Sequence, residues 1–159
     1  MHSVIFKNDA VGDLVHSIDA INNIVSSGER VTIFLSKLSQ NFSFLLKNKN
    51  VSIKILNYNL SIFERLKIVF FLLNSNVNKA YILSPKNFYF FLPFLFRKIK
   101  FYGICVNNVK NYKRPHEFLR KYLYKYEIND RGKAFKRESS RTIQKKLTYE
   151  GHNEYKFNI

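Results

Sequence analysis

Two aspartates stand on either side of a glycine where an apolar run near the start of the chain ends. The run "VIF" is followed by Lys7, Asn8 and Asp9, and Gly12 and Asp13 then open a helix-like pattern. If Gly12 turns the backbone tightly into that helix, Asp13 lies in its first turn, where the helix dipole favours an ionised carboxylate. Such a carboxylate can accept a hydrogen bond or a proton from a hydroxyl group. Asp13 is therefore a candidate general base.

Two other roles for this loop compete with that chemistry. A phosphate-binding loop needs several glycines and no negative charge, whereas this loop has Gly12 alone and lacks the spacing G-x-G-x-x-G. Asp9 or Asp13 could instead accept hydrogen bonds from the backbone N–H groups at the helix start. The residue types disfavour a bound phosphate and leave capping open as the alternative.

Short β-rich runs alternate with longer helical patterns over most of the chain. The predicted strands are Ser3–Lys7, Arg30–Leu35, Val51–Leu56, Lys79–Leu83 and Lys100–Val106, and the predicted helices are Gly12–Ser26, Lys37–Lys47, Ser61–Asn74 and Pro85–Lys98. This order predicts an α/β fold, a Rossmann-like parallel sheet with helices on both faces. Ligands of such sheets bind beyond the carboxyl ends of the strands, where the loop Asn8–Asp13 lies.

Local signals indicate where several helices begin and end. Ser61 and Glu64 form an S-x-x-E capping box. Ser84 is expected to cap a helix that starts at Pro85, and Gly28 is expected to end the first helix.

The pattern changes after Val106. The segment Pro115–Ile128 has apolar residues at helical spacing, which predicts a further helix. From Asn129 onward charges are many and apolar residues sparse, which predicts a mobile, weakly ordered basic tail. We therefore expect a Rossmann-like domain over residues 1–128 and a tail over residues 129–159.

Composition narrows the class of protein. A chain of 159 residues suits one domain. The single Cys105 has no metal-binding neighbourhood, which predicts a cytoplasmic protein without a disulfide or a structural metal. Charges near the start exclude a signal peptide, and the apolar runs are shorter than the roughly 20 residues that span a bilayer.

The formal net charge of +16 favours an anionic partner such as phospholipid, a phosphorylated glycan or nucleic acid. The bias of an AT-rich genome toward Lys and Asn accounts for the same charge without a partner. Nucleic acid is the least favoured partner, because the basic residues are scattered and no recognised binding motif is present. The aromatic run Phe88–Phe96, followed by Arg97, Lys98 and Lys100, is either core or a contact with an anionic membrane.

The stretch "KNDAVGDLVHSIDAI" resembles the N-terminal signature of glycosyltransferase family 9, the ADP-heptose:lipopolysaccharide heptosyltransferases. In that signature a basic or polar residue precedes D-x-[I/V/M]-G-D and an apolar helix. The stretch "FLPFLFRKIKFYGI" looks like the family's fourth helix and fifth strand, with Arg97 and Gly103 at matching places. "HEFLRKYLYKYEI" looks like the following helix, so the resemblance covers Val4–Ile128.

This resemblance implies a GT-B fold whose N-terminal half holds a lipid-linked or phosphorylated glycan acceptor of the lipopolysaccharide core. A C-terminal half would hold a nucleotide-sugar donor such as ADP-heptose. The implied reaction is an inverting transfer without metal or other cofactor, with Asp13 as general base. Asp9 would orient the loop or bind acceptor. The implied acceptor-binding residues are Lys7, Asn8, Asp9, Gly12 and Arg97.

Two departures from the family pattern bear on this reading. Asp19 stands where family members usually have Pro, and nothing after Asn129 resembles a donor half or its P-G-x-x-x-x-x-K-x-W-P-like stretch. The expected function is therefore that of a heptosyltransferase-like glycosyltransferase, of which this chain is an incomplete N-terminal half. We expect the protein to be peripheral at the inner face of the cytoplasmic membrane. A separate donor domain is its expected partner. A non-catalytic module that binds acidic glycolipid or a membrane surface is the alternative.

Overall fold

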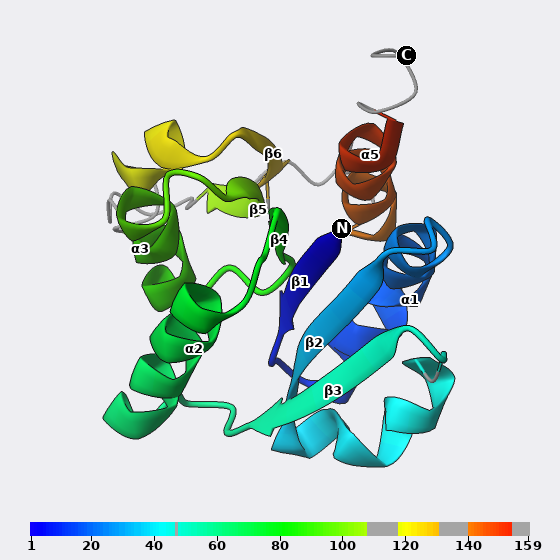
Figure 1. Cartoon of the computed structure of the whole chain (residues 1–159). Coiled ribbons are helices and arrows are strands. Elements are labelled where there is room, and N and C mark those ends of the chain that lie inside the picture. The colour runs from blue at the N-terminus through cyan, green and yellow to red at the C-terminus, as the bar shows by residue number, and fades with distance from the viewer. Residues whose placement is uncertain (47, 108–117, 131–139, 154–159) are drawn as a thin grey trace.

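The computed structural model describes residues 1–46, 48–107, 118–130 and 140–153, and six of its segments form one parallel sheet (Figure 1). The strands are β1 (His2–Lys7), β2 (Arg30–Ser36), β3 (Val51–Leu56), β4 (Lys79–Ile82), β5 (Lys100–Asn107) and β6 (Lys125–Asp130). The α-helices are α1 (Val11–Val25), α2 (Ile62–Asn74), α3 (Asn87–Leu95) and α5 (Ser140–Asn153), and the 3₁₀ helices are η1 (Lys37–Leu46) and η2 (Arg120–Tyr122).

The sheet has the strand order β3-β2-β1-β4-β5-β6, and every neighbouring pair is parallel. The chain runs outward from β1 to β3 and then crosses to the other side of β1. The order therefore reverses between β1 and β4, which is where ligands of such sheets bind. The five strands predicted from the sequence are confirmed to within a residue or two at their ends.

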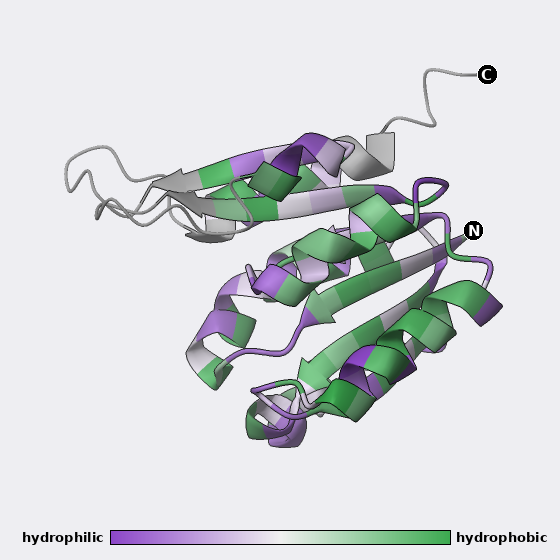
Figure 2. Ribbon diagram, turned by 90° about the vertical axis from the view of Figure 1, so that its left-hand side faces the viewer, coloured by the Kyte–Doolittle hydropathy of each residue, from purple (hydrophilic) through white to green (hydrophobic). Residues whose placement is uncertain are grey.

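Both faces of the central strands β1, β2 and β4 are buried, and successive residues of β1 alternate between them. Val4 and Phe6 pack on one side with Ile68 and Leu72 of α2. Ile5 packs on the other side among residues of α1, η1 and α5. The central strands are accordingly hydrophobic along most of their length (Figure 2), as expected for a parallel sheet covered by helices on both faces.

Two of the predicted helix boundaries are confirmed. The Ser61 hydroxyl accepts from the Glu64 backbone N–H at 3.2 Å, and the Glu64 carboxylate accepts from the Ser61 N–H at 2.8 Å, which completes the capping box of α2. Gly28 has a φ of 76°, a left-handed conformation suited to glycine, in the turn that follows α1.

The predicted start of α3 is wrong. The helix begins at Asn87 after the N-cap Lys86, and no side chain caps it. The buried Ser84 hydroxyl finds no hydrogen-bond partner among the described residues. The segment predicted as a helix from Lys37 is present, but it is the tighter 3₁₀ helix η1.

The helix predicted over Pro115–Ile128 is wrong in its second half. Residues 115–117 lie outside the described residues. Of the rest of this segment, helical turns occur between Phe118 and Tyr122, and Lys125–Asp130 form strand β6, paired with β5 from Tyr102 onward. Edge pairing with β5 satisfies the backbone of this segment, which outweighs the helical spacing of its apolar residues.

The weakly ordered tail predicted over residues 129–159 is wrong for residues 129–130, which end β6, and for α5, which packs against α1 in the same layer. Residues 131–139 and 154–159 lie outside the described residues. Ile143 and Leu147 are buried, and Leu147 belongs to the core cluster that contains Leu14. The Lys145 ammonium lies 2.9 Å from Oδ2 of Asp19 on α1. Residues 140–153 are therefore part of the domain, and Asp19 serves to pair with this helix.

No α-helix in the described ranges is both long and apolar enough to cross a membrane.

Candidate functional site

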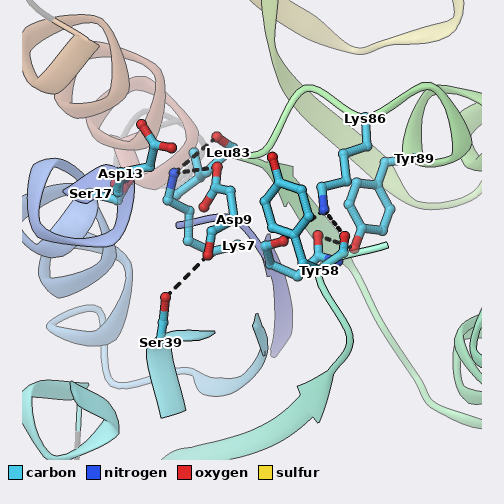
Figure 3. A network of polar contacts seen from close by, with 10 residues as sticks. Lys7, Asp9, Asp13, Ser17, Ser39, Tyr58, Leu83, Lys86 and Tyr89 are labelled. Carbon is cyan, nitrogen blue, oxygen red and sulfur yellow. Dashed lines mark hydrogen bonds and ion pairs between the residues drawn. The ribbon is translucent and has the colours of Figure 1, made fainter. Parts of the chain in front are cut away.

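Polar side chains gather at the carboxyl ends of β1, β3 and β4, on either side of the point where the strand order reverses (Figure 3). Lys7 ends β1, and Asn8 and Asp9 follow it directly. Tyr58 lies in the loop after β3, and Lys86 lies in the loop after β4. This arrangement brings together residues that are far apart in the sequence.

A buried ion pair fixes the start of the loop after β1. The Lys7 side chain is only 2% exposed, and its ammonium lies 3.0 Å from Oδ2 of Asp9, which is itself 13% exposed. Lys7 also donates to the carbonyl oxygen of Leu83 at 3.4 Å, and Ser39 Oγ donates to the carbonyl oxygen of Asp9 at 3.1 Å. These contacts hold the loop between β1, the end of β4 and η1.

The ion pair with Lys7 uses only one of the two carboxylate oxygens of Asp9. Asp9 Oδ1 is buried, and no described residue hydrogen-bonds to it. A buried carboxylate oxygen without a partner is costly. Among the described residues this oxygen is therefore an unused hydrogen-bond acceptor.

A second network holds Asn8 rigidly. Tyr89 donates its hydroxyl hydrogen to Asn8 Oδ1 at 2.6 Å, and Asn8 Nδ2 donates to the carbonyl oxygen of Asn57 at 3.1 Å. Burial, reinforced by the negative charge of Asp9, raises the pKa of Tyr89 far above its usual value. The phenol therefore stays protonated and keeps its role as donor.

Lys86 bridges the loops after β1 and β3. Its ammonium donates to the carbonyl oxygen of Asn8 at 2.8 Å and to that of Tyr58, and it lies 4.1 Å from the centroid of the Tyr58 ring. Burial lowers the pKa of Lys86; the carboxylate of Asp9 opposes that shift and the charge of Lys7 adds to it. The charges of two lysines and one aspartate therefore lie close enough to affect one another.

Asp13 lies in the first turn of α1 and is exposed, beside the Lys7–Asp9 pair (Figure 3). The N-cap of α1 is Ala10, and no side chain caps it. Among the described residues, none hydrogen-bonds to the Asp13 carboxylate; Ser17 Oγ donates to the Asp13 backbone carbonyl at 2.8 Å. The capping alternative for Asp9 and Asp13 is therefore wrong, and the Asp13 carboxylate is open to a ligand.

Gly12 does not have the expected role in a tight turn. It is a helical residue of α1 without a positive φ, and a Cβ built there would meet no atom within 4 Å. Its place is open surface next to Asp13, so a ligand can approach the backbone there.

The predicted site residues separate into two groups. Lys7, Asn8, Asp9 and Asp13 lie together, although Lys7 and Asn8 are buried and their polar groups are engaged inside the protein, so they position the loop. Arg97 lies away from them: it precedes β5, and parallel strands begin at the edge of the sheet opposite to the site.

Sequence reasoning missed Ser39, Tyr58, Lys86 and Tyr89. Three of them could have been found by their position in the sequence, because Ser39, Tyr58 and Lys86 each follow the carboxyl end of a strand. Tyr89 could not be singled out, because it lies within the aromatic run Phe88–Phe96. Within the described ranges no three His, Cys, Asp or Glu side chains are grouped so as to hold a metal ion.

The strand order and the site at its reversal point define a Rossmann-like α/β domain. No family model and no curated protein matches the sequence. Among solved structures the chain is similar to the E. coli heptosyltransferase WaaC with ADP, with a TM-score of 0.57 and 12% sequence identity. The match covers 94% of this chain and 46% of that chain, so the chain spans less than half the length of the protein it resembles. A likeness at this identity shows a common fold.

Proposed function

We propose that this chain is the acceptor-binding part of a heptosyltransferase-like glycosyltransferase, with Asp13 as general base. The observation that carries the proposal is the exposed Asp13 carboxylate, free of protein partners among the described residues, at the carboxyl edge of the sheet. The fold likeness to a heptosyltransferase and the D-A-V-G-D motif support it.

The proposed reaction is direct displacement at the sugar of a nucleotide-sugar donor such as ADP-heptose. An acceptor hydroxyl gives its proton to Asp13 as its oxygen forms a bond to the anomeric carbon. The bond from that carbon to the diphosphate breaks, and the nucleoside diphosphate leaves with the electron pair. A positioned carboxylate base typically raises the rate of such a step by about 10²–10⁴-fold.

The buried residues of the site have a positioning role in this proposal. The Lys7–Asp9 pair and the hydrogen bond from Tyr89 to Asn8 hold the loop that leads into α1. Asp9 orients the loop through its ion pair with Lys7, and its buried Oδ1 has no partner among the described residues. The expected acceptor is a lipid-linked or phosphorylated glycan.

The test is transfer of labelled heptose to a lipopolysaccharide-core acceptor by the full chain mixed with a separately produced heptosyltransferase donor half. We expect Asp13→Asn to lower the transfer rate at least about a hundredfold, with acceptor binding retained. Asp19→Asn is the matched control, because Asp19 is a partly exposed carboxylate of the same helix that pairs with Lys145 away from the site; it should leave transfer unchanged.

If Asp13→Asn transferred heptose at the wild-type rate, Asp13 would not be the general base. Acceptor binding without transfer by the wild-type chain would favour the alternative, a module that binds acidic glycans without acting on them. Absence of both binding and transfer would overturn the proposal.

A further inference from the structure

Helix α2 is apolar on two sides. Ile68 and Leu72 are buried in the core, whereas Phe63 is 78% exposed and Phe70 is 59% exposed. Leu66 and Leu73 are exposed as well. Positions 63, 66, 70 and 73 are separated by three or four residues, so they form one stripe along the outer side of the helix. The outer side of a surface helix is ordinarily polar, and a contiguous apolar stripe there indicates a binding surface.

The C-terminal half of α2 stands between two hollows, and α2 and α3 lie on the same side of the sheet (Figure 1). One hollow, of about 620 Å³, lies between α2 and the strands β2 and β3, with Phe34, Leu56 and Phe70 in its lining. The other, of about 570 Å³, lies between the ends of α2 and α3, with Leu73 and Leu95 in its lining. The stripe therefore continues into a depression on each side, and the one beside β2 and β3 is the more apolar of the two.

Every charged residue that lines these two hollows, among those the structure describes, is a cation. Lys54 and Lys67 line the first hollow, and Arg97 and Lys98 line the second. The guanidinium carbon of Arg97 lies 5.8 Å from the centroid of the exposed Phe94 ring. Exposed Phe and Leu side chains suit the boundary between lipid headgroups and acyl chains, and Lys and Arg suit anionic headgroups.

We propose that this surface, the exposed stripe of α2 with its two hollows, docks on a bilayer that contains anionic phospholipid. The charges favour lipid over a second copy of the chain, because two such surfaces brought together would place cations opposite cations. The proposal also gives Arg97 a role, since that residue lies away from the candidate active site.

The test is cosedimentation of the full chain with vesicles of phosphatidylcholine alone or of phosphatidylcholine mixed with phosphatidylglycerol. We expect binding to the mixed vesicles only. The double variant Phe63→Ser/Phe70→Ser should weaken that binding at least about tenfold, since each exposed ring is withdrawn from the interface. Lys67→Gln/Arg97→Gln should weaken it about thirtyfold, as expected for two charges near the surface.

Matched controls come from the other side of the sheet. Phe44 of η1 is also 59% exposed, and η1 packs with α1 on the opposite face. Phe44→Ser and Lys37→Gln should therefore leave vesicle binding unchanged. All the substituted side chains are exposed, so circular dichroism melting curves should match that of the wild type.

Equal binding to both kinds of vesicle, or binding that the α2 variants do not weaken, would overturn the proposal. A dimer in solution that Phe63→Ser/Phe70→Ser dissociates, without vesicle binding, would assign the surface to a second copy instead. The vesicles contain no sugar acceptor, so the outcome is independent of the role proposed for Asp13.

Discussion

The ammonium of Lys7 lies 3.0 Å from Oδ2 of Asp9, although one residue ends a strand and the other stands in the loop beyond it. A lysine buried this deeply requires a compensating charge. The pair therefore ties the end of β1 to the loop that leads into α1.

Removing one partner of this pair should be costly. Asp9→Asn leaves the Lys7 ammonium buried without a counter-charge, so we expect a loss of about 3 kcal/mol in the free energy of unfolding. Lys7→Met/Asp9→Asn removes both charges, so its free energy of unfolding should fall less than that of the single variant. Urea denaturation measures both, and an unchanged midpoint for Asp9→Asn would show that the pair does not stabilise the fold.

Asp13→Asn, in contrast to Asp9→Asn, should leave the stability of the protein almost unchanged. Its carboxylate has no partner among the described residues, so only its interaction with the helix dipole is lost, which costs less than about 1 kcal/mol. Thermal unfolding of this variant should nearly coincide with that of the wild type. A large loss of stability would instead indicate a structural role for Asp13.

Helix α5 should contribute strongly to stability. Leu147 is fully buried in the core cluster next to α1, so Leu147→Ala should lower the free energy of unfolding by about 2–5 kcal/mol. Tyr149 of the same helix is exposed, and Tyr149→Ser should change it by less than about 0.5 kcal/mol. Equal denaturation midpoints for the two variants would mean that α5 does not pack as described.

The capping box of α2 should make stability depend on pH. Partial burial opposes ionisation of Glu64, but hydrogen bonds from the backbone N–H groups of Asn57 and Ser61 outweigh it and lower the pKa of Glu64. The stabilisation is present above the ordinary glutamate pKa and is lost as the pH falls through the lowered value in the folded state.

The difference in unfolding free energy between wild type and Glu64→Gln measures this effect. It should be constant near neutral pH and decline in the acid range. Ser61→Ala should cost about 1 kcal/mol at neutral pH. A difference that persists unchanged in acid would contradict the stated cause.

Cys105 should be inert in the folded protein. Burial raises the pKa of its thiol to about 11, against the opposing charge of Arg120. Only about one thiol in ten thousand is then ionised at pH 7. A chromogenic disulfide reagent should react slowly with the native chain and fast after addition of guanidinium chloride. Fast reaction of the native chain would contradict the buried position.

The parts of the fold that the sequence predicted are those that local patterns determine. The strands and the capping box at Ser61 depend on residues close together in the chain, and the pattern of alternating strands and helices predicted the parallel sheet. The location of Asp9 and Asp13 at the carboxyl edge followed from the same rule.

The parts that were missed depend on partners distant in the sequence. Lys125–Asp130 become a strand because the edge of β5 is available, and α5 presents chiefly Ile143 and Leu147 to the core, too few apolar residues for a visible period. Lys86 and Tyr89 join the site through contacts with Asn8, which no local pattern reveals.

The packing of α5 on α1 has a consequence for synthesis of the chain on the ribosome. Leu14 and Ile21 of α1 emerge early, yet the core that buries them includes Leu147 of α5, which is synthesised much later. The nascent chain therefore exposes part of this core until α5 has been synthesised. Folding should end with a late docking step, during which the unfinished domain is the state most open to chaperones and proteases.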